Sequence, residues 1–302
     1  MAVESGIRTS PLLADRLLRA AGDYVALLKP KIILLLVVTE LGTMVAAARG
    51  WPRPEVVFGG VIGGALAAGG AGAINCWFDR DIDAVMTRTR RRPIPAGRIA
   101  PAQGLAFGIA VALGGVALIA VSTNVLAAAL AAGGGLFYVF VYTMWLKRST
   151  TQNIVIGGAA GAFPPLVGWA AVTGSLSPLA WALFAVVFFW TPPHFWALAI
   201  LLRRQYSAAN VPMLPAVVGP ERTRRAIVVY TTVMLAVSLV PAWWLGPVYA
   251  VAAAVLGAIF MGLAIETVRR DDGPSAMTLF HYSLAYLALL FVAAAVAATL
   301  RS

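Results

Sequence analysis

The fold of this chain is decided by residues 55–83, which read EVVFGGVIGGALAAGGAGAINCWFDRDID. Most of this stretch is an apolar run of about 20 residues, the length that an α-helix needs to cross the hydrocarbon core of a bilayer. The run ends in amide and carboxylate side chains at Asn75, Asp79 and Asp83. The stretch therefore predicts a membrane-spanning helix that carries polar groups to one face of the membrane.

The composition extends this interpretation to the whole chain. Of the 302 residues, 61% are hydrophobic and only 12% are charged, whereas soluble domains average about 45–50% and about 25%. Lipid offers no hydrogen-bond partners to the backbone, so a chain with this composition is expected to cross the membrane as helices. We therefore predict an all-α, polytopic membrane protein, with the lipid bilayer as its surroundings.

Nine apolar segments are each long enough to cross the bilayer. A turn at Gly246-Pro247 separates the seventh from the eighth. The predicted spans cover residues 32–49, 55–77, 102–122, 125–145, 154–173, 178–201, 226–246, 248–268 and 280–300. The sequence thus predicts a nine-helix transmembrane bundle over residues 29–302, preceded by a polar, cytoplasmic N-terminal segment over residues 1–28.

The chain has a net charge of +11, and the positions of its cations show what this charge means. In a soluble protein this charge would suggest nucleic acid as a partner. Here the cations lie between apolar runs, which points to membrane topology and an anionic ligand, with no nucleic-acid partner. If the N-terminus is inside, all of the 23 Lys and Arg residues lie on the cytoplasmic side except Arg49, Arg53 and Arg301. The bias predicts a cytoplasmic N-terminus and an external C-terminus.

The polar end of residues 55–83 is the candidate site. Asn75, Asp79 and Asp83 are spaced i, i+4, i+8 and lie along one stripe of a helix, whereas Asp81 faces elsewhere. Two carboxylates and an amide oxygen suit Mg²⁺, which commonly bridges carboxylates to substrate phosphates. The alternative is that these groups only cap or anchor helix ends. Cations that could bind phosphate on the same face are Lys29, Lys31, Arg88, Arg92, Lys147, Arg148, Arg203 and Arg204.

These motifs resemble a known family. The pattern N-x-x-x-D-x-x-x-D at 75–83, followed by M-x-R-T-x-x-R-P at 86–93, resembles the UbiA-type intramembrane prenyltransferases. Three further stretches are similar to the protohaem IX farnesyltransferase branch of that family. They are QNIVIGGAAG at 152–161, WTPPHFWAL at 190–198 and VPMLP at 211–215. The resemblance is strong over about residues 29–215, and beyond them it rests mainly on hydropathy.

The resemblance implies a reaction and a setting. Haem B and farnesyl diphosphate would be the substrates, and haem O would form by Mg²⁺-assisted allylic ionisation, attack on a vinyl group and addition of water. The fold would be a nine-helix bundle with an inner cavity open toward lipid, in a bacterial-type inner membrane, with its active site on the cytoplasmic face. A downstream haem A synthase would be a further partner.

The resemblance also assigns roles to residues. Asn75, Asp79 and Asp83 would hold Mg²⁺ and diphosphate. The cations that match the family's basic positions are Arg88, Arg92, Lys147 and Arg148, with Lys31 at the start of the first span. In the second long loop the branch usually has an acid before the tyrosine, where this chain has Gln205. An amide carries no charge, so we expect Arg203 and Arg204 to bind diphosphate directly there.

The haem side of the site is expected around His194. A neutral imidazole is a usual ligand of haem iron. Pro192 and Pro193 are expected to break the helix and aim the ring into a cavity, while Trp169 and Trp196 would supply aromatic walls. The alternative is a histidine that is hydrogen-bonded to a backbone carbonyl and has no ligand role.

Two other functions fit parts of the pattern. A prenyltransferase with a quinone-precursor acceptor would have the same metal site, although the sequence around His194 favours haem. A polytopic transporter would fit the topology, the intramembrane acid Glu40 and the carboxylates at the membrane boundary. Its charged site would then be expected near the middle of the membrane, whereas here the charge lies at one face.

Overall fold

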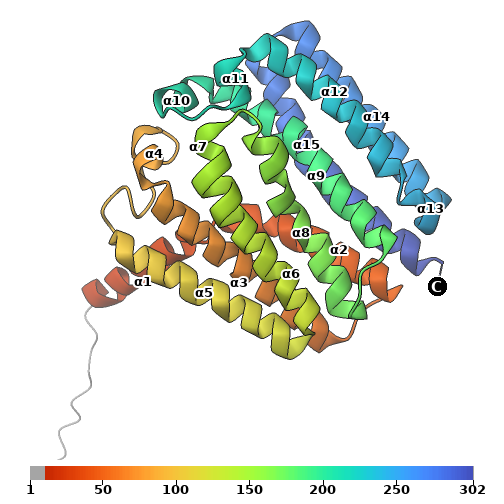
Figure 1. Ribbon diagram of the computed structural model, residues 1–302, viewed down its shortest axis with the longest axis horizontal. Helices are drawn as coiled ribbons and strands as arrows, with labels where there is room; N and C mark the ends of the chain where they lie inside the picture. The colour runs from red at the N-terminus through yellow and green to blue at the C-terminus, as the bar shows by residue number, and fades with distance from the viewer. Residues whose placement is uncertain (1–10, 302) are drawn as a thin grey trace, which may run out of the picture.

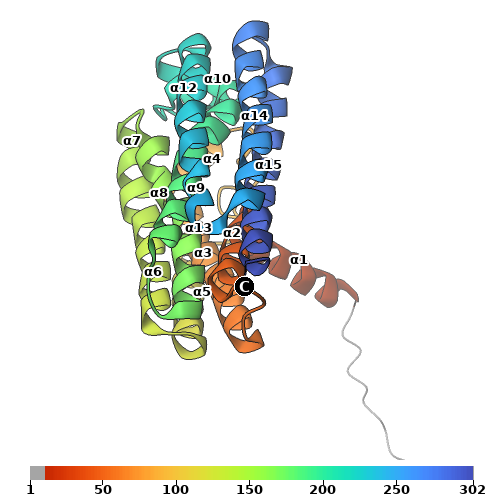
Figure 2. The same ribbon diagram turned by 90° about the vertical axis from the view of Figure 1, so that its right-hand side faces the viewer.

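The computed structural model describes residues 11–301, and this part of the chain consists of helices and connecting loops without a β-strand (Figure 1). Residues 1–10 and Ser302 lie outside the described residues. Arg8, one of the cations assigned to the cytoplasmic side, and the first part of the predicted segment 1–28 therefore lie outside them too. The first helix, α1 (Pro11–Leu27), points sideways from the bundle (Figure 2).

Within residues 11–301, nine helical stretches are long and apolar enough to cross a membrane. The fourth is composite, because α6 (Val125–Leu136) continues through a π-helical segment, η1 (Phe137–Leu146), into α7 (Lys147–Ser149). The seventh joins α12 (Pro220–Leu239) to α13 (Ala242–Leu245). The others are α2 (Pro30–Ala48), α3 (Pro54–Phe78), α5 (Pro101–Ser122), α8 (Asn153–Thr173), α9 (Pro178–Leu201), α14 (Pro247–Arg270) and α15 (Gly273–Thr299).

These stretches confirm the predicted nine-helix, all-α fold, while the orientation of the termini stays a prediction. Two helices begin earlier than their apolar segments suggested, α12 at Pro220 and α15 at Gly273. The first turns of α12 are charged and polar, and those of α15 mix small, polar and apolar residues, so hydropathy detects each helix only where it becomes continuously apolar. A helix that extends beyond the hydrocarbon core is common in this setting, since only the core requires apolar side chains.

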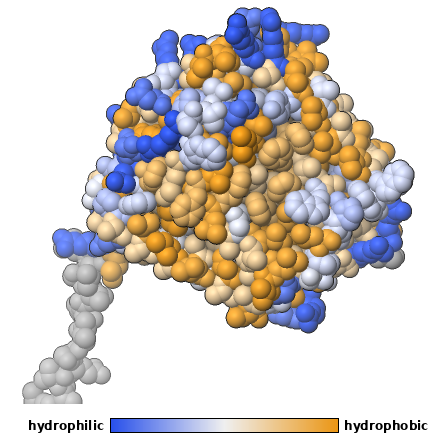
Figure 3. Space-filling model, viewed as in Figure 1, coloured by the Kyte–Doolittle hydropathy of each residue, from blue (hydrophilic) through white to orange (hydrophobic). Residues whose placement is uncertain are grey.

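The outside of the bundle is apolar. Large hydrophobic side chains such as Leu113, Val121 and Phe140 are 65%, 83% and 55% exposed. Figure 3 shows hydrophobic residues over most of one face, with hydrophilic residues gathered mainly toward its edges. A water-soluble protein rarely exposes apolar patches of this extent. The surface therefore matches a protein surrounded by lipid.

Close helix packing depends on glycine between α3 and α5. A Cβ on Gly70 would overlap the backbone of Gly108 and Ala112. A Cβ on Gly115 would overlap the backbone of Gly63 and Ala67 in the same way. Small residues at helix interfaces let backbones approach closely, which is a principal source of stability between membrane helices. This contact holds the polar end of α3 in place.

The expectation that Pro192 and Pro193 break their helix is wrong. Helix α9 runs without interruption from Pro178 to Leu201, and α8 likewise contains Pro164 and Pro165. Proline is tolerated within membrane helices because neighbouring helices and Ser or Thr side chains satisfy freed backbone groups.

The short helices gather at one end of the bundle. They are α4 (Arg80–Val85), α10 (Arg203–Ala208) and α11 (Leu214–Val217), and Figure 1 shows them beside α7. The opposite end carries α13 and the C-terminus. The two long loops predicted to share one membrane face therefore do share one end of the molecule.

Candidate functional site

The acidic stripe lies at the junction of α3 and α4. Helix α3 ends at Phe78, but the backbone N–H of Asp79 still donates to Asn75 at 2.9 Å, and that of Asp83 donates to Asp79 at 2.8 Å. The helical spacing is therefore kept across the junction. Asn75, Asp79 and Asp83 are all buried, whereas Asp81 is exposed. The arrangement is the one that the i, i+4, i+8 spacing predicts.

Hydrogen bonds orient the amide at the start of the stripe. The Asn75 Nδ2 donates to Asp79 Oδ2 at 2.7 Å and to Thr143 Oγ1 at 3.0 Å. The Asn75 Oδ1 accepts from Lys29 Nζ at 2.5 Å. Asp79 Oδ1 is fully buried and has no hydrogen-bond partner among the described residues, and Arg148 Nη2 lies 3.6 Å from it. One carboxylate oxygen of the stripe thus remains without a donor.

Three predicted cations contact the acids directly. Lys147 donates from Nζ to Asp79, and Arg92 Nη1 lies 2.7 Å from Asp83 Oδ2. Arg148 binds the exposed Asp81 through two nitrogens, each at 2.7 Å. The hydrogen bonds from Arg148 lower the pKa of Asp81 to about 2. The acids are therefore paired with cations that come from η1–α7 and from the loop after α4.

Arg92 is the most buried guanidinium of the basic loop. Burial lowers the pKa of Arg92, but the adjoining Asp83 carboxylate, together with other nearby groups, raises the pKa above its ordinary value. Arg88 is exposed, and its backbone N–H donates to Gln205 Oε1 at 3.2 Å. This bond joins the loop after α4 to α10. The two long loops therefore meet at Gln205, the position at which the related sequences usually have an acidic residue.

The remaining predicted cations have no polar contact with the stripe. Arg203 is half-buried and Arg204 exposed, and neither side chain has a hydrogen bond or ion pair within residues 11–301. Lys31 is exposed, also without a polar partner there. Both arginines lie on α10, beside Gln205, so they are near the basic loop. Their role in diphosphate binding stays a prediction.

Lys29, one of the candidate cations, contacts the stripe, whereas the resemblance assigned a site role to Lys31. Lys29 directly precedes α2, in the short connection from α1, and has a left-handed backbone, with φ 56° and ψ 56°. Its Nζ lies 2.5 Å from Asn75 Oδ1 and 3.4 Å from the hydroxyl of Tyr138. The signal in the sequence was the basic pair on either side of Pro30, but spacing alone does not say which lysine turns inward.

The three residues predicted to contact haem, Trp169, Trp196 and His194, pack against different neighbours. Trp196 is 2% exposed and packs edge-on against Tyr230, with 5.1 Å between ring centroids. Trp169 is half-buried in α8. His194 lies between Trp190 and Phe280, with centroid distances of 4.2 and 4.9 Å. No ring contact joins Trp169, Trp196 and His194 in the part of the chain that the structure describes.

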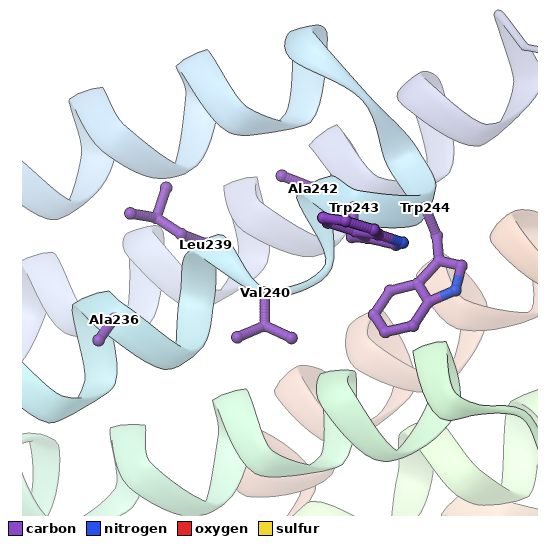
Figure 4. Close-up of a pocket in the computed structure, with 6 residues that line it drawn as sticks. All are labelled: Ala236, Leu239, Val240, Ala242, Trp243 and Trp244. Carbon is purple, nitrogen blue, oxygen red and sulfur yellow. The ribbon is translucent and has the colours of Figure 1, made fainter.

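Two surface grooves lie away from the predicted site residues. One is open and apolar and lies at the α12–α13 bend, and Figure 4 shows the residues that line it, Ala236, Leu239, Val240, Ala242, Trp243 and Trp244. Another lies between α12 and α14. Helices α12, α13 and α14 carry none of the predicted site residues. The inner cavity implied by the resemblance therefore stays a prediction.

The donor set of the stripe is compatible with a hard cation. Among residues 11–301 there is no group of three or more His, Cys, Asp and Glu side chains placed to hold a metal. The stripe instead offers two carboxylates and an amide, and Mg²⁺ usually keeps several waters beside one or two carboxylates. The partnerless Asp79 Oδ1 fits this chemistry, because a buried carboxylate oxygen is costly unless it is bonded.

Comparison with known proteins gives consistent matches. The model of the "UbiA prenyltransferase family" matches residues 35–293. Relatives called "Protoheme IX farnesyltransferase" include one from Gloeobacter violaceus, 51% identical over 92% of each chain, and one from Acidiphilium cryptum, 48% identical over 95% of this chain and 94% of that one. A relative of that name from Roseiflexus sp. is 51% identical over 91% of this chain, which spans 52% of that longer protein.

Solved structures share the architecture. A UbiA homolog from Archaeoglobus fulgidus bound to DMAPP and Mg²⁺ superposes with a TM-score of 0.70, at 16% identity, over 92% of this chain and 99% of that one. A digeranylgeranylglyceryl phosphate synthase superposes with a TM-score of 0.72, at 15% identity, over 93% and 99%. At these identities the likeness concerns the fold.

Proposed function

Because this chain belongs to the UbiA prenyltransferase family, we propose that it transfers the farnesyl group of farnesyl diphosphate to a vinyl group of haem B and so makes haem O. The acceptor is inferred from relatives about half identical in sequence, all of them called protohaem IX farnesyltransferases. Family membership disfavours a transporter. The observation that carries the proposal is the buried acidic stripe, with cations on several sides and one carboxylate oxygen, Asp79 Oδ1, that accepts no hydrogen bond from the described residues.

The proposed reaction balances with water as the third reactant. The bond between farnesyl C1 and the diphosphate oxygen breaks, and C1 bonds to the terminal carbon of the vinyl group. The hydroxyl of water adds to the inner vinyl carbon, and its proton is released with the diphosphate. A prenyltransferase that uses a quinone precursor would share the first step and differ in the acceptor.

Asn75, Asp79 and Asp83 would hold Mg²⁺ in this proposal. When bound, the ion would neutralise charge on the leaving diphosphate, as Mg²⁺ does in other phosphate chemistry. The Asp79 Oδ1 is the atom whose surroundings best fit a metal, since it is buried without a donor. Asn75 would contribute its amide oxygen, and Lys29, which contacts that oxygen here, would then donate to the diphosphate.

The cations would bind the diphosphate and stabilise it as a leaving group. Lys147, Arg92 and Arg148 already lie against the acids, so their positions are held before substrate arrives. Preorganised charges of this kind act where charge develops and need little reorganisation during the reaction. Arg88, Arg203 and Arg204 border the same end of the bundle and would extend the positive field toward the incoming diphosphate.

The setting of the reaction follows from the charge bias of the loops. We infer that the polar end of the bundle faces the cytoplasm, with the N-terminus inside and the C-terminus outside, in a bacterial-type inner membrane. His194, Trp169 and Trp196 would contact haem. A haem A synthase that accepts the product would be a partner.

A direct assay tests the proposal. Purified protein in lipid nanodiscs is incubated with haem B, farnesyl diphosphate and Mg²⁺, and haem O is quantified by chromatography and mass spectrometry. We expect haem O, at least about 100-fold less of it with Asp79→Asn, and near wild-type amounts with Asp81→Asn. The two aspartates are two residues apart but differ in burial. Absence of haem O, or equal activity of Asp79→Asn and wild type, would contradict the proposal.

A further inference from the structure

Helices α9 and α15 are joined by a polar contact inside an otherwise apolar interface. The Nδ1 of His194 lies 2.6 Å from the Oγ of Ser283, which is fully buried. The Trp190 Nε1 donates to the backbone carbonyl of the same serine at 2.9 Å. The Ser283 Oγ also lies 2.6 Å from the carbonyl oxygen of Phe280. Two side chains of α9 thus converge on one residue of α15.

The hydrogen-bond pattern determines which imidazole nitrogen carries the proton. The Phe280 carbonyl can only accept, so the Ser283 hydroxyl donates its single proton to it. The Ser283 oxygen must then accept from His194, and the proton of the neutral ring lies on Nδ1. The lone pair lies on Nε2, which has no hydrogen-bond partner within residues 11–301. Nε2 is a common ligand atom for metals, with the other nitrogen donating to a neighbour.

The ring itself cannot easily turn away. His194 is stacked on Trp190 with an interplanar angle of 15° and on Phe280 with one of 23°. The two aromatic faces fix the plane of the ring, but they do not distinguish its two edges. The bond to Ser283 does distinguish them, because it holds the Nδ1 edge toward α15.

We propose that Ser283 is a positioning residue that holds His194 with Nε2 available to the iron of the haem substrate. This inference rests on the proposed function. His194 lies two turns before the end of α9 at Leu201, about 10 Å inside the polar end of the bundle at 1.5 Å per residue. Haem bound there would lie deeper than the diphosphate site, and its vinyl edge could reach toward that site.

Haem binding without farnesyl diphosphate tests the inference separately from turnover. Haem B is titrated into the full-length protein in nanodiscs, and the Soret band and electron paramagnetic resonance spectrum of the ferric form report axial ligation. We expect a histidine-ligated spectrum for the wild type and its loss in His194→Gln. Loss of the residue that hydrogen-bonds a metal-bound histidine typically lowers metal affinity about 10- to 100-fold. Ser283→Ala should therefore weaken haem binding about 10-fold or more.

Two further variants separate positioning from packing. Ser283→Thr keeps the hydroxyl and should retain the wild-type spectrum and most of the affinity. Ser238→Ala removes another fully buried serine, which accepts from Tyr286 at 2.8 Å, and should leave haem binding unchanged. A folded Ser283→Ala protein with wild-type affinity and spectrum would overturn the inference. An unchanged spectrum in His194→Gln would also overturn it, whereas a wild type that binds no haem would count against the proposed function.

Discussion

Lys29 provides the sharpest test of how the diphosphate site is built. Lys29 and Lys31 lie on either side of Pro30, and the resemblance assigned the site role to Lys31. In the structure the Lys29 Nζ lies 2.5 Å from Asn75 Oδ1, while Lys31 is exposed without a polar partner among residues 11–301. We therefore predict that Lys29→Met impairs catalysis and that Lys31→Met does not.

The expected size follows from the contact that is lost. A hydrogen bond to a charged group contributes about 1.5–3 kcal/mol, and each 1.36 kcal/mol corresponds to about tenfold in rate. Removal of the ammonium group should thus lower kcat/KM for farnesyl diphosphate by about 10- to 150-fold. Lys31→Met should lower it by less than about threefold, as expected for an exposed charge.

The assay is initial-rate haem O formation at varied farnesyl diphosphate, in nanodiscs of one lipid composition. Lys29→Arg keeps the positive charge and should recover much of the lost rate. Thermal unfolding of each variant serves as the folding control, since Lys29→Met also alters the junction of α1 and α2. If Lys29→Met stays within threefold of wild type, or if both methionine variants lose activity equally, the assignment of Lys29 is refuted.

Three further predictions concern the bundle and the two loops. Gly70→Ala should lower the melting temperature in detergent, because overpacking costs about 1–3 kcal/mol. Gly114→Ala should leave the melting temperature unchanged, since no atom lies within 4 Å of the added methyl group, and equal shifts would contradict the packing argument. Gln205→Glu keeps an acceptor for the basic loop and adds a negative charge, so half-maximal activity should need several-fold less Mg²⁺; a higher requirement would argue against a metal near α10. Arg92→Gln should raise the KM for farnesyl diphosphate about tenfold or more, because the guanidinium lies 2.7 Å from the Asp83 carboxylate and so belongs to the site. The exposed Arg90 is the control, and Arg90→Gln should change the KM less than about threefold. Similar KM values for the two variants would show that only the total charge of the loop matters.

Much of the fold was predictable because its determinants are local. Apolar runs long enough to cross a bilayer identify nine helices, and they do so without knowledge of which helices touch. The acidic stripe was predictable for a similar reason, since helical spacing alone places Asn75, Asp79 and Asp83 on one side and Asp81 on another. The local sequence led to a wrong prediction at Pro192 and Pro193, because packing within the bundle keeps α9 helical through both prolines.

The tertiary structure decided which groups meet. Lys147 reaches Asp79 from η1–α7, and Gln205 reaches the backbone of Arg88 from α10, across separations in sequence of 68 and 117 residues. Ser283 meets His194 across 89 residues. No periodicity in the sequence encodes such pairs, because they depend on how helices pack. Local patterns of residues predict the membrane bundle and its acidic stripe, whereas the packing of the helices selects the cation, amide and hydroxyl that complete the site.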